Sequence, residues 1–159
     1  ILTKKAIFYK NSEKIVTQGK TEADIQSKYF ITSRDVTYLY DKKILSSNHK
    51  TKIQDQKSQV YFADNFSFSV NQEIIKGENF LIITNYNLPK SDKFFLDSAI
   101  INLEENKFIA KNTKIEVHKD IFDNSENDPR IVGLSSSGDK DYTLINKGIF
   151  TSCKKKENF

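Results

Sequence analysis

The sequence predicts an all-β protein built from antiparallel strands. Residues that favour strands, above all Ile, Phe, Tyr, Thr and Val, recur in short groups along the 159 residues, while Met and Trp are absent. No stretch keeps the spacing of an amphipathic helix, whereas short alternating segments are separated by polar turns. We therefore expect roughly eight to twelve short strands joined by hairpin-like turns.

The first predicted unit consists of two strands and the turn between them. Its first strand ends in the pair Ile7 and Tyr9, and the polar residues 10–14 form the turn. In the second strand every other residue from Ile15 to Ala23 is apolar or small, and the residues between them are largely polar. One face of this strand is therefore expected to point inward.

The same pattern returns at later positions, with apolar residues matching apolar ones and small residues matching small ones. A shift of 29 residues aligns the first unit with the second, a shift of 30 continues the pattern, and a shift of 64 gives a weaker copy. The aligned sets are Ile7, Tyr9, Ile15, Thr17 and Gly19 with Val36, Tyr38, Ile44, Ser46 and Asn48; Ile31, Ser33, Val36 and Tyr38 with Tyr61, Ala63, Phe66 and Phe68; and Val36, Ile44, Ser46 and Asn48 with Ile100, Phe108, Ala110 and Asn112. Such periods indicate stacked units that bury their apolar faces against their neighbours.

A residue type that tolerates unusual backbone angles stands in the middle of the inner row in three copies. These residues are Gly19, Asn48 and Asn112. Glycine and asparagine adopt positive φ more readily than other residues, so we expect the strands to bend there. Bends at the same level of successive strands would curl the whole sheet.

The chain changes character after Asp120. Residues 120–129 are polar and rich in turn formers, and two apolar groups, at 130–134 and 142–145, flank a second turn. We expect a loop followed by a final hairpin. The chain is thus divided into a β-domain over residues 1–125 and, as an appendage of the same domain, a final hairpin and cysteine-containing connector over residues 126–159.

Charge and hydropathy limit the class of protein. The net charge of +4 comes almost wholly from lysines scattered among acidic residues, which is typical of solvated strand edges. The apolar run Phe80 to Ile83 is the longest in the chain and far shorter than the roughly 18 residues of a membrane-spanning helix. Because the chain begins at Ile1 and its first residues lack a secretory signal, we expect it to be a processed or truncated piece.

No catalytic or metal-binding motif is complete. His49 and His118 lie in different repeats and Cys153 is the single cysteine, whereas a zinc site needs about four ligands. The acidic loop near Asp123 lacks the glycine of a calcium loop, and the segment after Gly133 lacks the lysine of a phosphate loop. Aromatic residues share rows with Ile and Val, so we expect them inside rather than on a nucleic-acid-binding face. We expect no enzyme activity, metal, cofactor or nucleic-acid partner.

The apolar inner wall has two possible roles. It either packs shut as an ordinary core or encloses a lipid. The periodicity alone leaves both alternatives open.

The repeats resemble the OstA-type repeat that is shared by the periplasmic lipopolysaccharide-transport proteins LptA, LptC and the N-terminal domain of LptD. Segments that carry the resemblance include Arg34-Asp-Val-Thr-Tyr and Lys43-Ile-Leu-Ser-Ser-Asn, and it extends over residues 2–117. The tail resembles the link between the LptD N-terminal domain and its outer-membrane β-barrel, with Asp128-Pro-Arg-Ile-Val-Gly and then Gly148-Ile-Phe-Thr-Ser-Cys. The family's usual Gly-Asn-Val is replaced by Gly19-Lys-Thr and Asn48-His-Lys.

The resemblance implies an antiparallel β-jellyroll, or half-open curled sheet, whose interior carries the acyl chains of lipopolysaccharide. It implies a periplasmic domain of an outer-membrane protein from a Gram-negative bacterium. The implied partners are an LptA-like bridge, joined by edge-strand pairing, and an LptE-like lipoprotein, reached through a barrel outside this sequence. The residues expected to line the lipid groove are Val36, Tyr38, Ile44, Phe66, Phe68, Ile100, Phe108, Ile115 and Val117.

Alternatives remain open for the bonding state of the single cysteine and for the function of the chain. Cys153 either is an unpaired or buried thiol, or pairs with a cysteine outside this chain. The resemblance implies the second, a disulfide with the barrel portion. Two other functions are weighed against the translocon domain: a stand-alone bridge of LptA or LptC type, and a closed β-sheet adhesion or scaffold module.

Overall fold

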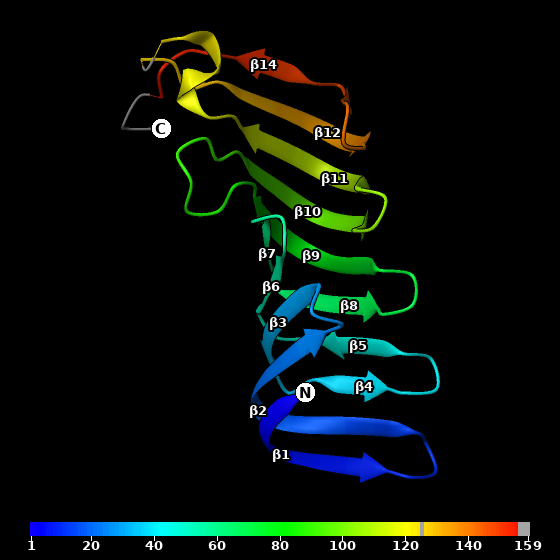
Figure 1. Cartoon of the computed structure of the whole chain (residues 1–159). Coiled ribbons are helices and arrows are strands. Elements are labelled where there is room, and N and C mark those ends of the chain that lie inside the picture. Colours follow the sequence, from blue (N-terminus) through cyan, green and yellow to red (C-terminus); the bar gives the residue numbers. More distant parts are fainter. Residues whose placement is uncertain (125, 156–159) are drawn as a thin grey trace.

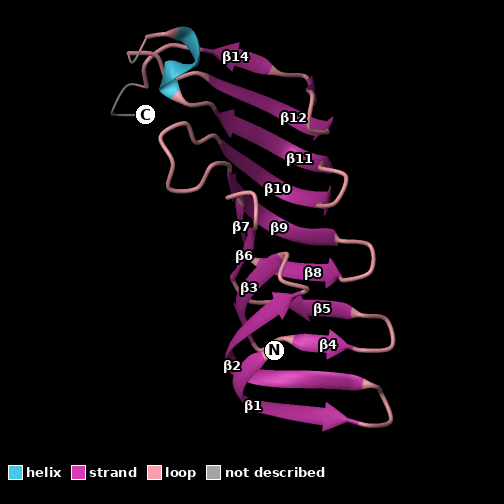
Figure 2. Cartoon of the chain, viewed as in Figure 1, coloured by secondary structure: helices cyan, strands magenta, loops and turns pink. Residues whose placement is uncertain are grey.

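The computed structural model describes residues 1–124 and 126–155, and its regular structure is almost wholly strand (Figure 1, Figure 2). Its 14 strands form one antiparallel sheet. The elements, in chain order, are β1 (Leu2–Tyr9), β2 (Lys14–Ile25), β3 (Tyr29–Arg34), β4 (Thr37–Leu39), β5 (Ile44–Ser47), β6 (Thr51–Asp55), β7 (Val60–Ala63), β8 (Asn65–Ser69), β9 (Ile74–Ile83), β10 (Lys93–Asn102), β11 (Lys107–Glu116), the 3-10 helix η1 (Lys119–Phe122), β12 (Arg130–Gly138), β13 (Thr143–Asn146) and β14 (Ile149–Thr151). The predicted all-β antiparallel fold is confirmed. The strands outnumber the prediction because several bent segments are split into two short strands.

Two long strands, β2 and β9, organise the sheet. β2 pairs with β4 near its start and with β3 near its end, and β9 pairs in the same way with β8 and β7. Two arcs therefore run between them, β4-β5-β8 and β3-β6-β7, and complete a hydrogen-bonded ring of eight strands. β1 lies on the outer edge of β2, and β10 to β14 continue the sheet beyond β9, so that Figure 1 shows an elongated stack.

Residues with positive φ mark bends within the long strands. The φ angle is 83° at Gly19 in β2, 52° at Asn79 in β9 and 48° at Asn112 in β11. The predicted bends at Gly19 and Asn112 are confirmed. The chain also bends at Asn48, as predicted, but there the bend separates β5 from β6 instead of lying within one strand, and φ at Asn48 is not positive.

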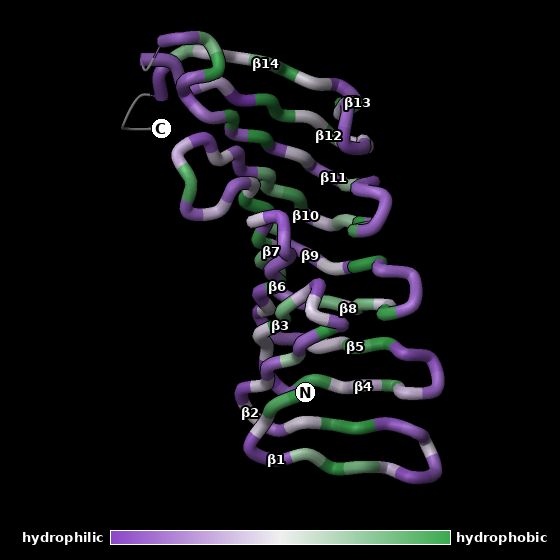
Figure 3. Tube along the Cα trace, viewed as in Figure 1, coloured by the Kyte–Doolittle hydropathy of each residue, from purple (hydrophilic) through white to green (hydrophobic). Residues whose placement is uncertain are grey.

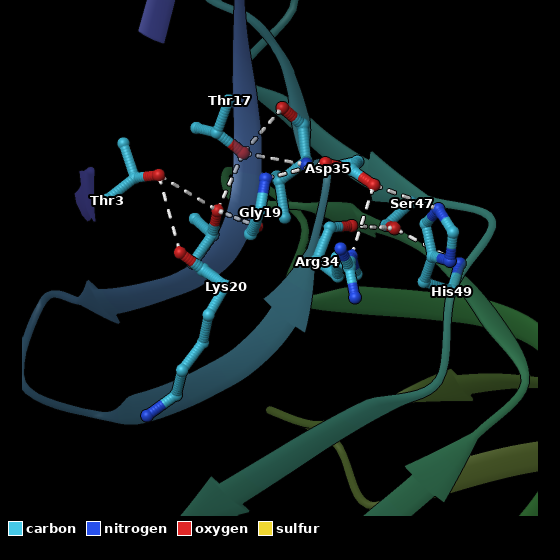
Figure 4. A network of polar contacts seen from close by, with 10 residues as sticks. Thr3, Thr17, Gly19, Lys20, Arg34, Asp35, Ser47 and His49 are labelled. Carbon is cyan, nitrogen blue, oxygen red and sulfur yellow. Dashed lines mark hydrogen bonds and ion pairs between the residues drawn. The ribbon is translucent and has the colours of Figure 1, made fainter. Parts of the chain in front are cut away.

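The bend in β2 is held by side chains from neighbouring segments (Figure 4). The carboxylate of Asp35 accepts a hydrogen bond from the backbone N–H of Gly19 at 2.7 Å, and its other oxygen lies 3.2 Å from Nε2 of His49. On the inner side of the bend, the buried hydroxyls of Thr17 and Thr21 are 2.6 Å apart. The bend therefore has a polar network on both of its sides.

Aspartates also hold the bends in β9 and β11. The side-chain amide of Asn79 donates to Asp64 at 2.8 Å, and that of Asn112 donates to Asp97 at 2.7 Å. In each pair the aspartate precedes the asparagine by 15 residues. The same device thus recurs along the corner of the curled sheet.

The bends change which residues of a strand face inward. In β10 the buried or partly buried residues on the inner face are Phe94 and Leu96, then Ala99 and Ile101, with an extra residue between the two pairs. Asp97 lies at the corner of the sheet with Asn79 and Asn112. These three residues are left out of the ladders of β9, β10 and β11, and the register of the strands is the same before and after them. A strict alternation counted from Leu96 would therefore assign the residues after Asp97 to the wrong face.

The inner face of the ring forms a continuous apolar core. Figure 3 shows hydrophobic residues along the strands and hydrophilic ones at most of the turns. Small residues occupy the inside of the corner, where the two limbs of the bent sheet leave little room, and larger residues lie further out. The small set includes Thr17, Thr21, Ser33, Ser47, Thr51, Ala63, Ala99, Ala110, Thr113 and Ser136, and the large set includes Tyr29, Ile31, Leu45, Ile53, Phe68 and Ile75.

The C-terminal segment continues the same sheet. β12 pairs with β11, and both β13 and β14 pair with β12. The helix η1 overlaps the start of the predicted loop of residues 120–129, which is followed by the final hairpin. The predicted division between residues 125 and 126, and the end of the connector, involve residues 125 and 156–159, which lie outside the described residues.

Candidate functional site

An apolar cavity lies inside the curled sheet where β10 and β11 extend beyond the ring. Its volume is about 310 Å³. Strands β7, β9, β10 and β11 supply most of its floor, and the turns that follow β10 and β12 supply part of its rim. The apolar residues that line it are Tyr61, Ile82, Phe94, Leu96, Ile101, Leu103 and Phe108.

Phe94 and Phe108 contact each other across this interior. Their ring centroids are 6.5 Å apart and their planes meet at 80°, an edge-to-face arrangement. In register, Phe94 is opposite Ile115 and Phe108 is opposite Ile101, so the contact does not follow strand pairing. The curl of the sheet brings the two rings together from different limbs, with the cavity beside them.

The rim of the cavity is polar and carries two lysines. Lys107 and Lys140 are exposed, and Asp139 lies beside Lys140 in the chain. The Nζ atom of Lys107 lies 2.8 Å from Oε2 of Glu105, and the hydrogen bond to this carboxylate raises the pKa of Lys107. An apolar floor with cations at its edge suits a ligand that has an apolar chain and an anionic head.

A second polar group closes the mouth of the curled sheet next to the cavity. Nζ of Lys28 lies 2.6 Å from Oε1 of Glu73, and the Tyr29 hydroxyl donates a hydrogen bond to Oε2 of the same carboxylate. These hydrogen bonds lower the pKa of Glu73, that from Lys28 most, although burial opposes them. Burial, and then the bond to Glu73, raises the pKa of Tyr29. We call Lys28, Tyr29 and Glu73 the Glu73 clasp.

No model of a known protein family matches the sequence, and no curated protein matches it significantly. Functional inference therefore depends on the geometry of the cavity and of its surroundings, together with the resemblance carried by the repeats.

Most of the predicted groove residues face the interior but do not line the cavity. Val36, Phe66 and Phe68 are buried in the core, with exposed fractions of 2%, 3% and 0%. Tyr38 is partly buried and packs against the same core. The ring around them is filled by its own side chains, so these positions form packed core in this structure.

The predicted groove residues in β11 and just after it lie nearer the cavity. Phe108 lines it, whereas the other predicted groove residues do not. Ile115 is buried, and Val117, just after the end of β11, is partly buried. The backbone N–H of Val117 donates to the carbonyl of Pro129 at 3.0 Å, which ties the end of this strand to the segment before β12.

Two inner-wall predictions are wrong. Ile100 is 47% exposed on the outer face, because the alternation of inner and outer residues shifts by one at the corner where Asp97 lies, so that Ile101 points inward. Ile44 is adjacent to the buried Leu45 in β5, and successive side chains in a strand alternate, so Leu45 holds the inner position. Both errors are displacements by one residue.

The sequence interpretation missed most of the residues that line the cavity. Phe94, Leu96 and Ile101 lie in β10, and Ile82 lies in the apolar run at the end of β9. A signal was present in the density of large apolar residues in these two strands. Assigning their faces requires knowledge of the bends, which the repeats locate only in part.

The two histidines have structural contacts. His49 lies beside Asp35 at the first bend, and Nδ1 of His118 is 2.8 Å from Asp92, which also accepts the backbone N–H of His118 at 2.8 Å. Across residues 1–124 and 126–155, no group of three or more potential metal ligands is found. Within the same ranges, no helix is long and apolar enough to cross a membrane.

Proposed function

We propose that this chain is the periplasmic jellyroll domain of an outer-membrane lipopolysaccharide translocon of the LptD type. In this role it binds acyl chains inside the curled sheet and passes lipopolysaccharide from a periplasmic bridge toward a β-barrel. The observation that carries the proposal is the apolar cavity of about 310 Å³ between the limbs of the sheet, with lysines at its rim. No step of such transport requires a catalytic residue in this domain.

The cavity supports the proposal through the chemistry of its two zones. An acyl chain buried against Phe94, Leu96 and Phe108 leaves water, and burial contributes about 25 cal/mol per Å² of apolar surface. The phosphates and sugars of the head stay in water, within reach of Lys107 and Lys140. The amphiphile thus keeps each part in the surroundings that it prefers.

An edge strand supports the proposed contact with an LptA-like bridge. β1 pairs with β2 along one edge only, and no strand of the described chain covers its other edge. An uncovered strand edge can pair with a strand of another protein by β-augmentation. We propose that the bridge extends the sheet at this end.

Cys153 supports the proposed link to a barrel. It follows β14 at the opposite end of the stack from β1, and its side chain is exposed. Its carbonyl accepts a hydrogen bond from Arg130 at 2.8 Å, which fixes the backbone beside the thiol. We propose a disulfide between Cys153 and the barrel, with an LptE-like lipoprotein reached through that barrel.

A second candidate function is a closed adhesion or scaffold module. The buried interior of the ring favours it, since Leu45, Ile53 and Phe68 are at most 1% exposed and do not line the cavity. A third candidate, a stand-alone bridge of LptA or LptC type, shares the cavity but not a barrel. A long series of amphipathic strands encoded after this segment distinguishes the translocon domain from the bridge.

Native mass spectrometry with purified lipid A tests the lipid-binding role. We expect a one-to-one adduct with the wild-type chain and at least about tenfold weaker binding for Phe108→Asp and Leu96→Asp, because a carboxylate in the apolar floor costs more than about 1.4 kcal/mol. Ile109→Asp is the matched control, since Ile109 is 66% exposed on the outer face of β11.

Circular dichroism of each variant verifies that the sheet is intact. Equal adducts for the wild type and for folded Phe108→Asp and Leu96→Asp would remove the cavity as the lipid site. Absence of any adduct with the wild type would favour the closed module.

A further inference from the structure

The Glu73 clasp joins two parts of the ring that share no strand pairing. Tyr29 is the first residue of β3, which belongs to the arc β3-β6-β7, and Lys28 precedes it in the turn after β2. Glu73 lies in the turn between β8 and β9, at the end of the arc β4-β5-β8. The clasp is therefore a side-chain connection across the interior, formed by residues 44 and 45 positions apart.

Glu73 is nearly buried, and each of its oxygen atoms has a defined hydrogen-bond partner. Glu73 is only 8% exposed, and both of its carboxylate oxygens are occupied, one by Lys28 and one by Tyr29. Its backbone carbonyl accepts a hydrogen bond from the N–H of Leu103 at 2.9 Å. A nearly buried carboxylate requires such partners, because an unpaired one is costly.

The clasp stands between the filled core and the cavity. On the core side, the ring of Tyr29 packs edge-on against Phe68, with centroids 5.6 Å apart. On the cavity side lies a polar hollow of about 220 Å³, lined in part by the clasp and by Lys57, which shares the lining residue Leu103 with the cavity. The clasp therefore lies between the core around Phe68 and the hollow beside the cavity.

We propose that the Glu73 clasp is a gate across the mouth of the curled sheet. When it is closed, the lipid site ends at Tyr61 and Leu103; when it is open, the two arcs separate at this point and the apolar groove extends to Phe68. The effect on lipid binding rests on the proposed function. The opening itself can be measured without any ligand.

The clasp is held by side-chain interactions, which can break while the strand pairing stays intact. No backbone hydrogen bond joins β3 to β8, so opening breaks side-chain contacts and leaves both arcs intact. The Lys28 side chain is 49% exposed, and water or an anionic headgroup can replace Glu73 as its partner. A ligand shifts such an equilibrium only if it binds the open form more tightly, and apolar contact with Tyr29 and Phe68 supplies that difference.

A spin-label distance between the two turns tests the gate without lipid. Labels are placed at Ser27 and Gln72, which are exposed next to the clasp, in a Cys153→Ser background. We expect one narrow distance distribution in this background and an added longer population in Glu73→Gln and Tyr29→Phe. The matched control is Glu105→Gln, which removes an exposed Lys–Glu pair at the rim and should leave the distribution unchanged. Identical distributions in all four proteins overturn the gate.

Photocrosslinking with lipid A tests the consequence for the groove. A photoreactive residue replaces Phe94 in the cavity or Phe68 in the core. We expect lipid adducts from position 94 in every background, and from position 68 at least about fivefold more in Glu73→Gln than in the parent chain, which corresponds to about 1 kcal/mol. Adducts at position 94 with no increase at position 68, together with unchanged spin-label distances, reject the gate and keep the proposed function.

Absence of adducts at position 94 rejects the proposed function instead. The spin-label distances then still decide whether the clasp opens, so the two failures are distinguishable.

Discussion

Two phenylalanines on the inner face have different surroundings. Phe68 is fully buried in the core of the ring. Phe108 packs against the same core but borders the cavity, so part of its surface has no protein neighbour. One residue type thus serves packing at one position and is available to a ligand at the other.

Stability measurements should separate the two phenylalanines. We expect Phe68→Ala to lower the free energy of unfolding by about 3–5 kcal/mol, because the substitution leaves a cavity in a packed core. Phe108→Ala should lower it by only about 1–2 kcal/mol, since less apolar surface is lost. Urea denaturation monitored by circular dichroism measures both. A larger loss for Phe108→Ala would mean that the cavity wall is the main core.

The clasp should make stability depend on pH through Glu73. Its pKa in the folded chain is lowered from the ordinary value of 4.5, chiefly by the hydrogen bond from Lys28. A group with a depressed pKa stabilises the fold above its unfolded pKa, and this contribution is lost as the pH falls through the folded pKa. The wild type should therefore be more stable than Glu73→Gln at neutral pH, and the difference should vanish at low pH.

Urea midpoints of the two proteins measured from neutral to acid pH test this dependence. A stability difference that stays constant through the acid range would show that the Glu73 carboxylate does not carry it. Glu105→Gln is again the matched control, because Glu105 is exposed and its ion pair is screened by solvent.

At the scale of single elements, the bends decide how the strands are placed. Asn112 has a φ of 48° and donates to Asp97, so both its backbone and its side chain serve the bend. A residue with a β-branched side chain is strained at positive φ, whereas glycine is not. The backbone and side-chain contributions can therefore be separated by two substitutions at one position.

We expect Asn112→Val to lower the free energy of unfolding by about 2–3 kcal/mol, from left-handed strain and the lost hydrogen bond together. Asn112→Gly should lower it by about 1 kcal/mol, because only the hydrogen bond is lost. Thermal or urea unfolding measures the difference. Equal losses for the two variants would show that positive φ is not what this position requires.

The sequence indicates the hairpins and some of the bends. It is less informative about which side chains point to the inner face of the sheet. Repeats, turns and alternation predict the antiparallel sheet and the bends at Gly19 and Asn112 correctly. The repeats do not indicate the bend at Asn79, because this residue does not align with the repeated positions. Alternation places Ile100 on the inner face, because the sequence pattern does not reveal that the alternation shifts by one residue at the corner where Asp97 lies.

The cavity was still less accessible to sequence interpretation than the strands. Its wall combines Tyr61 from the ring with Phe94 and Phe108 from beyond it, and the contact between the last two crosses the interior rather than following register. Such a contact depends on the curl of the whole sheet. Periodicity identifies which residues are apolar, but the shape that they enclose is a property of the assembled strands.

At the scale of the whole molecule, the ring and its extensions differ in the number of contacts that hold each strand. Strands of the ring have hydrogen-bonded neighbours on both sides and face a buried core. β13 and β14 each pair only with β12, and Leu144 and Ile149 on them are 55% and 72% exposed. Local stability should therefore fall from the ring toward the C-terminal end.

Hydrogen exchange measured by mass spectrometry tests this gradient. We expect the slowest amide exchange in β5, β6, β8 and β9, and the fastest among the strands in β13 and β14, because opening there breaks few bonds and exposes little apolar surface. β1 should exchange at an intermediate rate, as it pairs along most of its length with one neighbour. Uniform protection across all strands would contradict a stable ring with weaker extensions.

The closed ring also determines how the molecule would respond to mechanical load. Hydrogen bonds between antiparallel strands lie perpendicular to the strands, so tension applied between β1 and β14 acts along these bonds and can unzip them in succession. The outermost strands would detach first, one at a time and at low force. Between β2 and β9, two ladders share the load in parallel and have to rupture together, which makes the ring the mechanically resistant part of the chain.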